Sequence, residues 1–186
     1  MPYLSEIQLQ QLNFKSLGKN VKISPKASIY ESERMEIGDN VRIDDFCVIS
    51  GKVKLGRNVH IAIFCNIGGG ELGVELQDFA GLAYGCHVFS QNDDYSGNTL
   101  TNPTVPVKYK IESKKAVLIK KHVIIGTNSI VFPGVTVEEG CSIGAMSLVT
   151  KSTDPWGIYV GCPAKRVKER SRDLLELEKQ YIAEEI

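Results

Sequence analysis

Two adjacent aspartates, Asp93 and Asp94, are the first residues of this chain whose types and spacing suggest chemistry. They lie in the segment SQNDDYSGNTL, residues 90–100, which interrupts an otherwise regular hydrophobic pattern. Paired carboxylates can hold a cationic group such as an ammonium ion. Aspartates also begin tight turns, and the following YSG tripeptide would suit one. The sequence therefore leaves two interpretations of this pair, a ligand-binding group and a turn.

The three histidines of the chain are candidate general bases, because imidazole changes its protonation near neutral pH. His60 stands directly before Ile61 and His87 directly before Val88, so both rings are expected to point outward from a turn, as bases or as solvated groups. His122 lies among lysines in KKHVIIG and is expected to face solvent or a bound cofactor. Zinc would require all three rings to converge, which the distant position of His122 in the repeat disfavours, so no metal site is expected.

An aliphatic side chain recurs every six residues along much of the chain. This repeat defines the elements that must position the aspartates and histidines. Its members are Ile37, Ile43, Ile49, Leu55, Ile61 and Ile67, then Leu76, Leu82 and Val88, then Ile119, Ile125, Val131, Val137, Ile143 and Val149. A period of six suits short strands separated by sharp turns, and three such hexads would make one coil of a parallel β-helix. One coil cannot bury its own apolar face, so neighbouring coils must stack.

Four of the five cysteines occupy a second small position of the repeat, four residues after an aliphatic one. They are Cys47, Cys65, Cys86 and Cys141. At that position a thiol packs as a small hydrophobic group, so we expect these cysteines to be buried and unreactive.

The ends of the chain and one interruption depart from the repeat. We expect a helix within residues 1–18, with Ser5 as its cap, and an amphipathic helix over residues 164–186. The β-helix is expected between them, over residues 19–154, with a loop at residues 89–116. Because the ends of a coil stack are exposed, each helix is expected to cover one end. A loop of this length on a rigid scaffold is usually functional.

Composition excludes several classes of function. The 22 Lys and Arg residues balance 22 Asp and Glu residues, so no net basic charge attracts nucleic acid. No apolar run approaches the roughly 18–20 residues that span a bilayer, and the N-terminal residues lack the pattern of a signal peptide. We therefore expect a cytoplasmic protein that forms one domain over residues 1–186 and does not insert into a membrane.

The hexads, together with the segments IGAMSLVTKS and GCPAKRVK, resemble the hexapeptide-repeat acyltransferases. The resemblance implies an all-β fold, a left-handed parallel β-helix with short terminal helices. It also implies a homotrimer that binds acetyl-coenzyme A or another acyl-coenzyme A in the groove between neighbouring subunits. The segments VRIDDFCVISGKVKLGRNVHIA, DDYSG, NPTVP and KKHVIIGTNSIVFPGV are further similar to bacterial N-acyltransferases of nucleotide-linked amino sugars, a group that includes an enzyme of anthrose biosynthesis.

This resemblance assigns roles to particular residues. Asp94, with Asp93 second, would hold the amino group of the acceptor, since an amine needs mainly orientation before it attacks a thioester. Backbone groups at small residues would contact the pantetheine arm, and basic residues near the end of the groove would bind the phosphates of coenzyme A. The expected cofactor-binding residues are Gly126, Thr127, Gly144, Ala145, Lys151, Lys165 and Arg166. Ala83 and Tyr84 stand where relatives often have serines, which could change the sugar that is recognised.

The expected reaction is transfer of an acyl group, by expectation acetyl, to a nucleotide-linked amino sugar in surface polysaccharide (O-antigen) biosynthesis. Two alternatives stay open. A sugar O-acetyltransferase would need His87 or His60 to take the proton of a hydroxyl group. A β-helix can also serve as an assembly or metal-binding scaffold, as in the γ-class carbonic anhydrases, although an inert scaffold would not need paired aspartates on a long loop.

Overall fold

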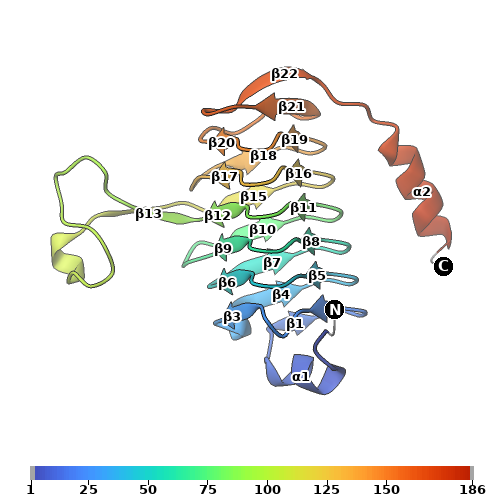
Figure 1. Ribbon diagram of the computed structural model, residues 1–186, viewed down its shortest axis with the longest axis horizontal. Helices are drawn as coiled ribbons and strands as arrows, with labels where there is room; N and C mark the ends of the chain where they lie inside the picture. Colours follow the sequence, from blue (N-terminus) through green and yellow to red (C-terminus); the bar gives the residue numbers. More distant parts are fainter. Residues whose placement is uncertain (1–2, 185–186) are drawn as a thin grey trace.

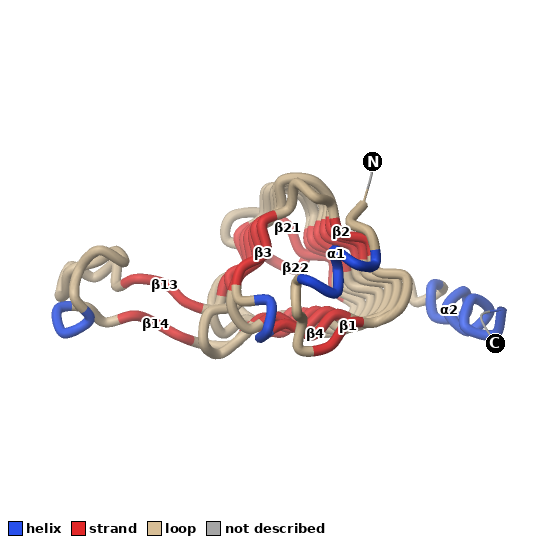
Figure 2. Tube along the Cα trace, turned by 90° about the horizontal axis from the view of Figure 1, so that it is seen from below, coloured by secondary structure: helices blue, strands red, loops and turns tan. Residues whose placement is uncertain are grey.

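A computed structural model describes residues 3–184 of the chain, and its body is a stack of parallel strand coils (Figure 1). Residues 1–2 and 185–186, the outermost parts of the expected domain and terminal helices, lie outside the described residues. Three sheets run along the stack, with six, eight and six strands, and we call them the first, second and third sheets. Viewed from below, they form the three sides of each coil (Figure 2).

The strands are short, as the six-residue repeat predicts. The first sheet contains β1 (Ser16–Leu17), β4 (Met35–Ile37), β7 (Val53–Leu55), β10 (Val74–Leu76), β15 (Val117–Ile119) and β18 (Thr136–Val137). The second contains β2 (Lys22–Ile23), β5 (Arg42–Ile43), β8 (His60–Ile61), β11 (Gly81–Leu82), β16 (Ile124–Ile125), β19 (Ser142–Ile143), β21 (Gly157–Val160) and β22 (Lys165–Glu169). The third contains β3 (Ser28–Tyr30), β6 (Val48–Ser50), β9 (Asn66–Gly68), β12 (His87–Phe89), β17 (Ile130–Val131) and β20 (Leu148–Val149).

The hexad side chains fill the inside of the stack. In the first sheet, for example, Ile37 pairs in register with Leu55, which pairs with Leu76 on the next coil. All fifteen aliphatic residues of the repeat are at most 3% exposed. Burying each such side chain contributes about 1.5–3 kcal/mol, so the stack of coils forms the core. The expected parallel β-helix is confirmed.

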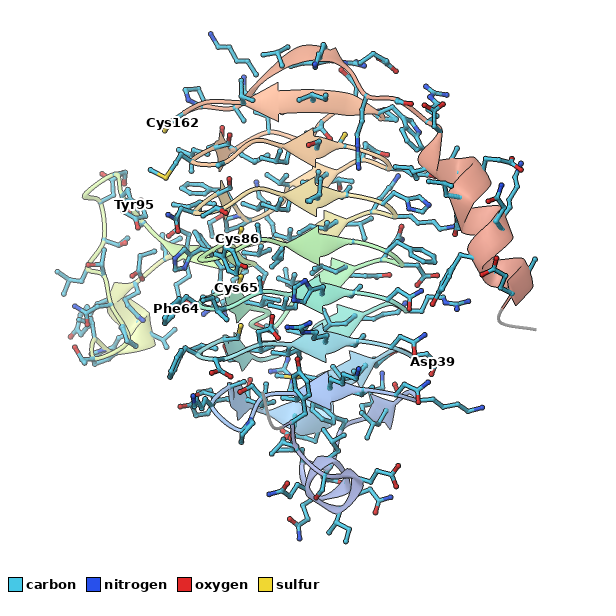
Figure 3. The ribbon with its side chains drawn as sticks, turned by 45° about the vertical axis from the view of Figure 1, so that its right-hand side comes forward. Asp39, Phe64, Cys65, Cys86, Tyr95 and Cys162 are labelled. Carbon is cyan, nitrogen blue, oxygen red and sulfur yellow. The ribbon has the colours of Figure 1, made fainter. Side chains whose placement is uncertain are left out.

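The four inward cysteines are also where the repeat predicts them. Cys47, Cys65, Cys86 and Cys141 are buried, and Figure 3 shows Cys65 and Cys86 one above the other inside the coil. The Cys65 Sγ donates to the Ala83 carbonyl oxygen at 3.0 Å. Contact with Cys47 lowers the pKa of Cys65, but Cys86 and burial outweigh this effect and raise the pKa to about 12. Cys65 is therefore a packing group and is not a reactive thiolate.

The expected loop leaves the coil between the third and first sheets. It begins and ends as a two-stranded antiparallel ribbon, β13 (Gln91–Asp93) with β14 (Glu112–Lys114), and contains the short 3₁₀ helix η2 (Val107–Tyr109). Figures 1 and 2 show the ribbon extending away from the coil, with its tip far from the three sheets. The loop therefore contributes little to the core of its own chain.

The N-terminal helix forms as expected. Helix α1 (Glu6–Gln11) begins after Ser5, whose side chain accepts a hydrogen bond from the Gln8 backbone, while the Gln8 side chain accepts one from the Ser5 N–H. This capping box satisfies two N–H groups that a helix end leaves without partners. The helix lies below the first coil (Figure 1), and a second short 3₁₀ helix, η1 (Ser32–Arg34), lies in the same part of the fold.

The C-terminal part differs from the expectation. The coil stack does not end at residue 154, because β21 continues the second sheet by pairing with β19. Residues expected to begin a helix at 164 instead form β22, which pairs antiparallel with β21 and covers that edge of the sheet. Helix α2 (Leu174–Glu184) starts ten residues later than expected and descends beside the coil instead of covering its end (Figure 1).

Candidate active site

The candidate acid–base residues lie on different sides of the coil. His60 and His87 are strand residues with exposed side chains, on β8 of the second sheet and β12 of the third, and not turn residues as expected. Asp93 ends β13 and Asp94 follows it on the projecting loop. A single chain therefore does not bring the two aspartates and the two histidines together.

Asp94 organises a turn and carries a negative charge. Its carboxylate accepts hydrogen bonds from the Ser96 N–H at 2.9 Å, the Ser96 hydroxyl at 2.8 Å and the Thr99 hydroxyl at 3.1 Å. The Ser96 backbone and side chain, followed by Thr99, hold the pKa of Asp94 below its ordinary value. The neighbouring Asp93 accepts from the Asn102 N–H at 3.3 Å. The turn geometry is thus present, and it presents an ionised carboxylate at the surface of the loop.

His60 is part of a network that sequence reasoning missed. Its Nε2 lies 2.8 Å from Oδ2 of Asp44, and Asp44 also accepts from the Arg42 Nε at 2.7 Å and the Arg42 Nη2 at 3.2 Å. Arg42 and His60 are direct neighbours in the register of the second sheet. The signal was available in the spacing, because residues 18 apart, three hexads, occupy the same place on adjacent coils. The RID segment at 42–44 therefore predicts a carboxylate near His60.

His122 does not face solvent, so the first of its two expected positions is wrong. Its side chain is 6% exposed, and its Nε2 lies 2.9 Å from Oε2 of Glu178 on α2. Its ring also stacks on Phe79, with ring centroids 5.3 Å apart. The sequence position among lysines suggested exposure, but the folded C-terminal helix covers this corner of the coil. His122 is a structural group in the described part of the chain.

A groove separates α2 from the outer face of the second sheet. Its volume is about 430 Å³. The groove is lined by His60, Gly81 and Ile124 on the coil side and by Leu177 and Tyr181 on the helix side. The groove therefore combines apolar side chains with two histidines on its coil side.

The small residues proposed to contact a cofactor stack at the corner between the second and third sheets. A Cβ on Gly126 would lie 2.5 Å from the Ala145 nitrogen, so the adjacent coil itself requires glycine there. The N–H groups of Gly126 and Gly144 donate to the Ile143 and Tyr159 carbonyls, at 2.7 and 2.8 Å. These two N–H groups are therefore occupied within the coil stack. Thr127 follows Gly126 at the same corner.

The basic residues proposed to bind phosphates lie near the last coil. Lys165 and Arg166 are on β22 and not at a helix start, because β22 pairs with β21. Arg166 contacts Glu169 and lies 3.8 Å from Asp154, whereas Lys151 follows β20 and is exposed. Two of the three cations thus project from one strand at the C-terminal end of the stack.

Among residues 3–184, no group of three or more His, Cys, Asp and Glu side chains is arranged to hold a metal ion. Neither described helix is long and apolar enough to cross a membrane.

Comparison with known proteins shows what the chain is similar to. The bacterial transferase hexapeptide (six repeats) family matches residues 34–69. The dTDP-4-amino-4,6-dideoxy-D-glucose acyltransferase of Escherichia coli is 46% identical over 185 residues, which are 97% of this chain and 95% of that protein. The crystal structure of AntD, an N-acyltransferase from Bacillus cereus in complex with dTDP and 3-hydroxybutyryl-CoA, superimposes with a TM-score of 0.96 and 48% identity, covering 98% of this chain and 97% of that one.

A second AntD structure, the D94A mutant in complex with dTDP and Coenzyme A, gives a TM-score of 0.97 at 47% identity and covers 98% of both chains. The repeat, the projecting loop and the terminal segments are thus shared over nearly the whole length. This chain belongs to the hexapeptide-repeat acyltransferases, together with the N-acyltransferases that it matches from end to end.

Proposed function

We propose that this enzyme transfers an acyl group from acyl-coenzyme A to the amino group of a dTDP-linked amino sugar. The observation that carries the proposal is the end-to-end similarity to an acyltransferase of dTDP-4-amino-4,6-dideoxy-D-glucose and to AntD. One AntD structure contains dTDP-4-amino-4,6-dideoxyglucose together with Coenzyme A, so acceptor and spent donor occupy that fold at the same time.

Asp94 is proposed to hold the amino group of the sugar. Its carboxylate is ionised and lies on the exposed loop, where the Ser96 and Thr99 contacts fix its position. An aspartate with the same number was replaced in two AntD structures, the D94A and D94N mutants. A carboxylate oxygen that holds the amine by a hydrogen bond orients the amine nitrogen toward the thioester. This orientation accelerates the reaction. Asp93, held by Asn102, is the second candidate.

The active site is proposed to be shared between subunits of a homotrimer. The loop with Asp94 projects away from its own coil, whereas His60 and the groove beside α2 lie on the second sheet. A neighbouring copy would bring these surfaces together. Phe46 and Phe64 support assembly, because they are 50% and 55% exposed and stack with centroids 5.2 Å apart on the corner between the second and third sheets.

The donor is proposed to lie along the coil with its phosphates near the last turn. Lys165 and Arg166 on β22, with Lys151, would bind the phosphates, and the corner of Gly126, Thr127, Gly144 and Ala145 would contact the pantetheine arm. Because the adjacent coil already requires Gly126, the glycines do not by themselves support a cofactor contact. The phosphate contacts are the part of this proposal that mutagenesis tests most directly.

Tyr84, at the corner that follows β11, is proposed to influence which sugar is accepted. Its side chain is exposed there. We also propose that the reaction takes place in the cytoplasm and that it serves surface polysaccharide (O-antigen) biosynthesis.

The direct test offers purified protein dTDP-4-amino-4,6-dideoxyglucose with acetyl-coenzyme A or 3-hydroxybutyryl-coenzyme A and follows thiol release and product mass. We expect one acyl group on the amino nitrogen. dTDP-glucose, which has a hydroxyl in place of the C4 amine and a further hydroxyl at C6, is the control and should release no thiol. Thiol release with dTDP-glucose or simple galactosides, and none with the amino sugar, would replace amine acylation with hydroxyl acylation.

A further inference from the structure

His60 and Asp44 form a pair in which the histidine is accessible and the carboxylate is not. The Nε2 of His60 lies 2.8 Å from Oδ2 of Asp44, with the His60 side chain 48% exposed and the Asp44 side chain 5% exposed. A buried carboxylate behind an exposed imidazole is the arrangement that orients a proton acceptor toward a ligand. The pair joins adjacent coils of the second sheet and faces the outside of the stack.

Arg42 determines the charge of Asp44. Two of its nitrogens donate to the two carboxylate oxygens, at 2.7 and 3.2 Å. Burial alone would raise the pKa of Asp44, but the hydrogen bonds from Arg42 and His60 outweigh it and lower the pKa below its ordinary value. An ionised carboxylate only accepts hydrogen bonds, so the His60 Nε2 must carry the proton. The free nitrogen of the neutral ring is therefore Nδ1, which has a lone pair for a proton.

The space next to this ring is open. Gly81 follows His60 in the outward row of the second sheet, and a Cβ on Gly81 would meet only the His60 carbonyl oxygen, at an ordinary 3.6 Å. The coil therefore does not require glycine at this position, in contrast to Gly126. Because Gly81 has no side chain, the groove next to the His60 imidazole is open to a ligand.

The other two histidines lack this combination. The His122 ring is buried and held by Glu178, so it is not accessible to a ligand. The His87 ring faces outward on the third sheet, and it makes no hydrogen bond with any side chain that the structure describes. His60 is thus the described histidine that is both exposed and oriented by a carboxylate.

We infer that His60 is the base that accepts the proton of the attacking amine through Nδ1, and that Asp44 and Arg42 are positioning residues that fix its tautomer. This inference rests on the proposed function. The neutral amine attacks the thioester carbonyl carbon, and as the C–N bond forms its proton moves to Nδ1. The C–S bond then breaks, and the leaving thiolate takes the proton from the imidazolium. The products are the amide and coenzyme A thiol, and His60 is neutral again.

Asp94 and His60 have different tasks in this scheme. Asp94 holds and orients the amine, and His60 removes the proton that becomes acidic only after attack. In a homotrimer the loop with Asp94 would come from the neighbouring subunit, because it projects away from the sheet that carries His60. The scheme requires that the two residues face the same amine.

The first experiment compares His60→Gln with the parent enzyme across pH, using the amino sugar nucleotide and acetyl-coenzyme A. The glutamine amide can still donate to Asp44, so the fold is kept while the Nδ1 lone pair is lost. We expect kcat to fall by about 10²–10³, within the range for a lost general base. The acid limb that the imidazole adds to the parent profile should disappear, leaving only the limb of the amine. The other titratable groups around His60 are Asp44, which it contacts, and Arg42, which contacts Asp44 and has Tyr3 and Tyr84 nearby. His122, Arg170, Glu178 and Tyr181 also line its groove.

Rescue experiments separate a catalytic role from a structural one. Added imidazole should restore part of the activity of His60→Ala, because the exposed site lies in an open groove. Asp44→Asn should lower kcat by about tenfold with little change in KM, and Asp44→Glu should restore part of it. Lys54→Gln, which removes an exposed ion pair to Glu75 on the first sheet, is the control and should leave kcat unchanged.

The outcomes distinguish the two proposals. If the parent enzyme does not acylate the amino sugar nucleotide, the proposed function fails. If the parent does so and His60→Gln keeps the parent kcat and pH profile, the base assignment is overturned while the function stands. A loss of activity in His60→Ala that imidazole does not restore, with an unchanged pH profile in His60→Gln, likewise assigns the pair to structure alone.

Discussion

The Nε2 of His122 lies 2.9 Å from Oε2 of Glu178, and this contact fastens α2 to the corner between the first and second sheets. Glu178 also pairs with the Lys121 Nζ at 2.5 Å. Just before α2, the Arg170 guanidinium donates to the carbonyls of His122, Gly140 and Cys141. Since no side chain of α2 is fully buried, these polar contacts hold the wall of the groove in place.

Glu178→Gln should therefore loosen α2. Burial would raise the pKa of Glu178, but the hydrogen bonds from Lys121 and His122 outweigh burial and lower the pKa below its ordinary value. A lowered pKa means that the carboxylate stabilises the fold fully above its unfolded pKa, and the contribution is lost as the pH falls through the folded value. At neutral pH we expect faster amide hydrogen exchange over residues 174–184, corresponding to about 1–3 kcal/mol of local stability. In acid the two proteins should converge.

Glu176→Gln is the matched control on the same helix. Glu176 pairs with Lys179, and both side chains are largely exposed, so this change should alter exchange by less than about 0.5 kcal/mol. Equal effects of the two substitutions at neutral pH would contradict the anchoring role of Glu178.

Asp94→Asn should lower turnover with the amino sugar nucleotide by a factor of about ten to a thousand, because the orienting charge is lost. Ser96→Ala separates this effect from the turn, since Ser96 supports the carboxylate through its hydroxyl but offers no charge to the amine. We expect Ser96→Ala to cost less than tenfold in steady-state assays of thiol release. Similar losses in both variants would assign Asp94 to the turn.

Lys165→Ala with Arg166→Ala should weaken binding of acetyl-coenzyme A by about tenfold or more, if these residues contact the 3′-phosphate. Acetyl-dephospho-coenzyme A, which lacks that phosphate, should lose much less affinity. Calorimetry or KM values with both donors provide the measurement. Arg172→Ala is the control, because Arg172 lies beyond β22 and pairs with Glu169. Equal losses with both donors would mean that Lys165 and Arg166 serve only the β21–β22 pairing.

The protein should sediment as a trimer of about three times its 20.5 kDa chain mass. Phe64→Glu should dissociate it, because a charge would replace an exposed ring of the stacked Phe46–Phe64 corner. Leu72→Glu changes an apolar side chain of similar exposure elsewhere and should leave the trimer intact. Analytical ultracentrifugation at micromolar concentration measures both, and an active, monodisperse monomer would contradict the shared site.

Gly126→Ala should lower the stability of the fold, whereas Gly81→Ala should lower the activity. Gly126→Ala forces a Cβ to within 2.5 Å of a backbone nitrogen and should destabilise the fold by about 1–3 kcal/mol. Gly81→Ala meets an ordinary contact and should leave the melting temperature within about 2 °C of the parent, yet reduce kcat/KM by narrowing the groove beside His60. Thermal unfolding measures the change in stability, and steady-state kinetics measure the change in kcat/KM. A stable Gly126→Ala protein, or a fully active Gly81→Ala protein, would contradict this distinction.

The sequence by itself determined the coil. A strict period of six leaves the inward side of every strand aliphatic, so Ile37, Leu55 and Leu76 could only stack over one another once coils formed. The inward cysteines follow from the same register, and the Ser5 cap of α1 is a local contact within four residues. The projecting loop was visible too, because the repeat stops after Val88.

Only the tertiary structure decided what the histidines and the C-terminal segment do. His122 meets Glu178 across 56 residues and outside the repeat, so no spacing predicts that contact, whereas the repeat brings Asp44 near His60 without showing that the two side chains meet. The charged segment at 165–169 reads as the start of a helix, but the open edge of β21 offers unpaired backbone groups, and pairing with them outweighs helix propensity. Repetition along the chain specifies the core, whereas contacts between distant segments specify which exposed side chains meet.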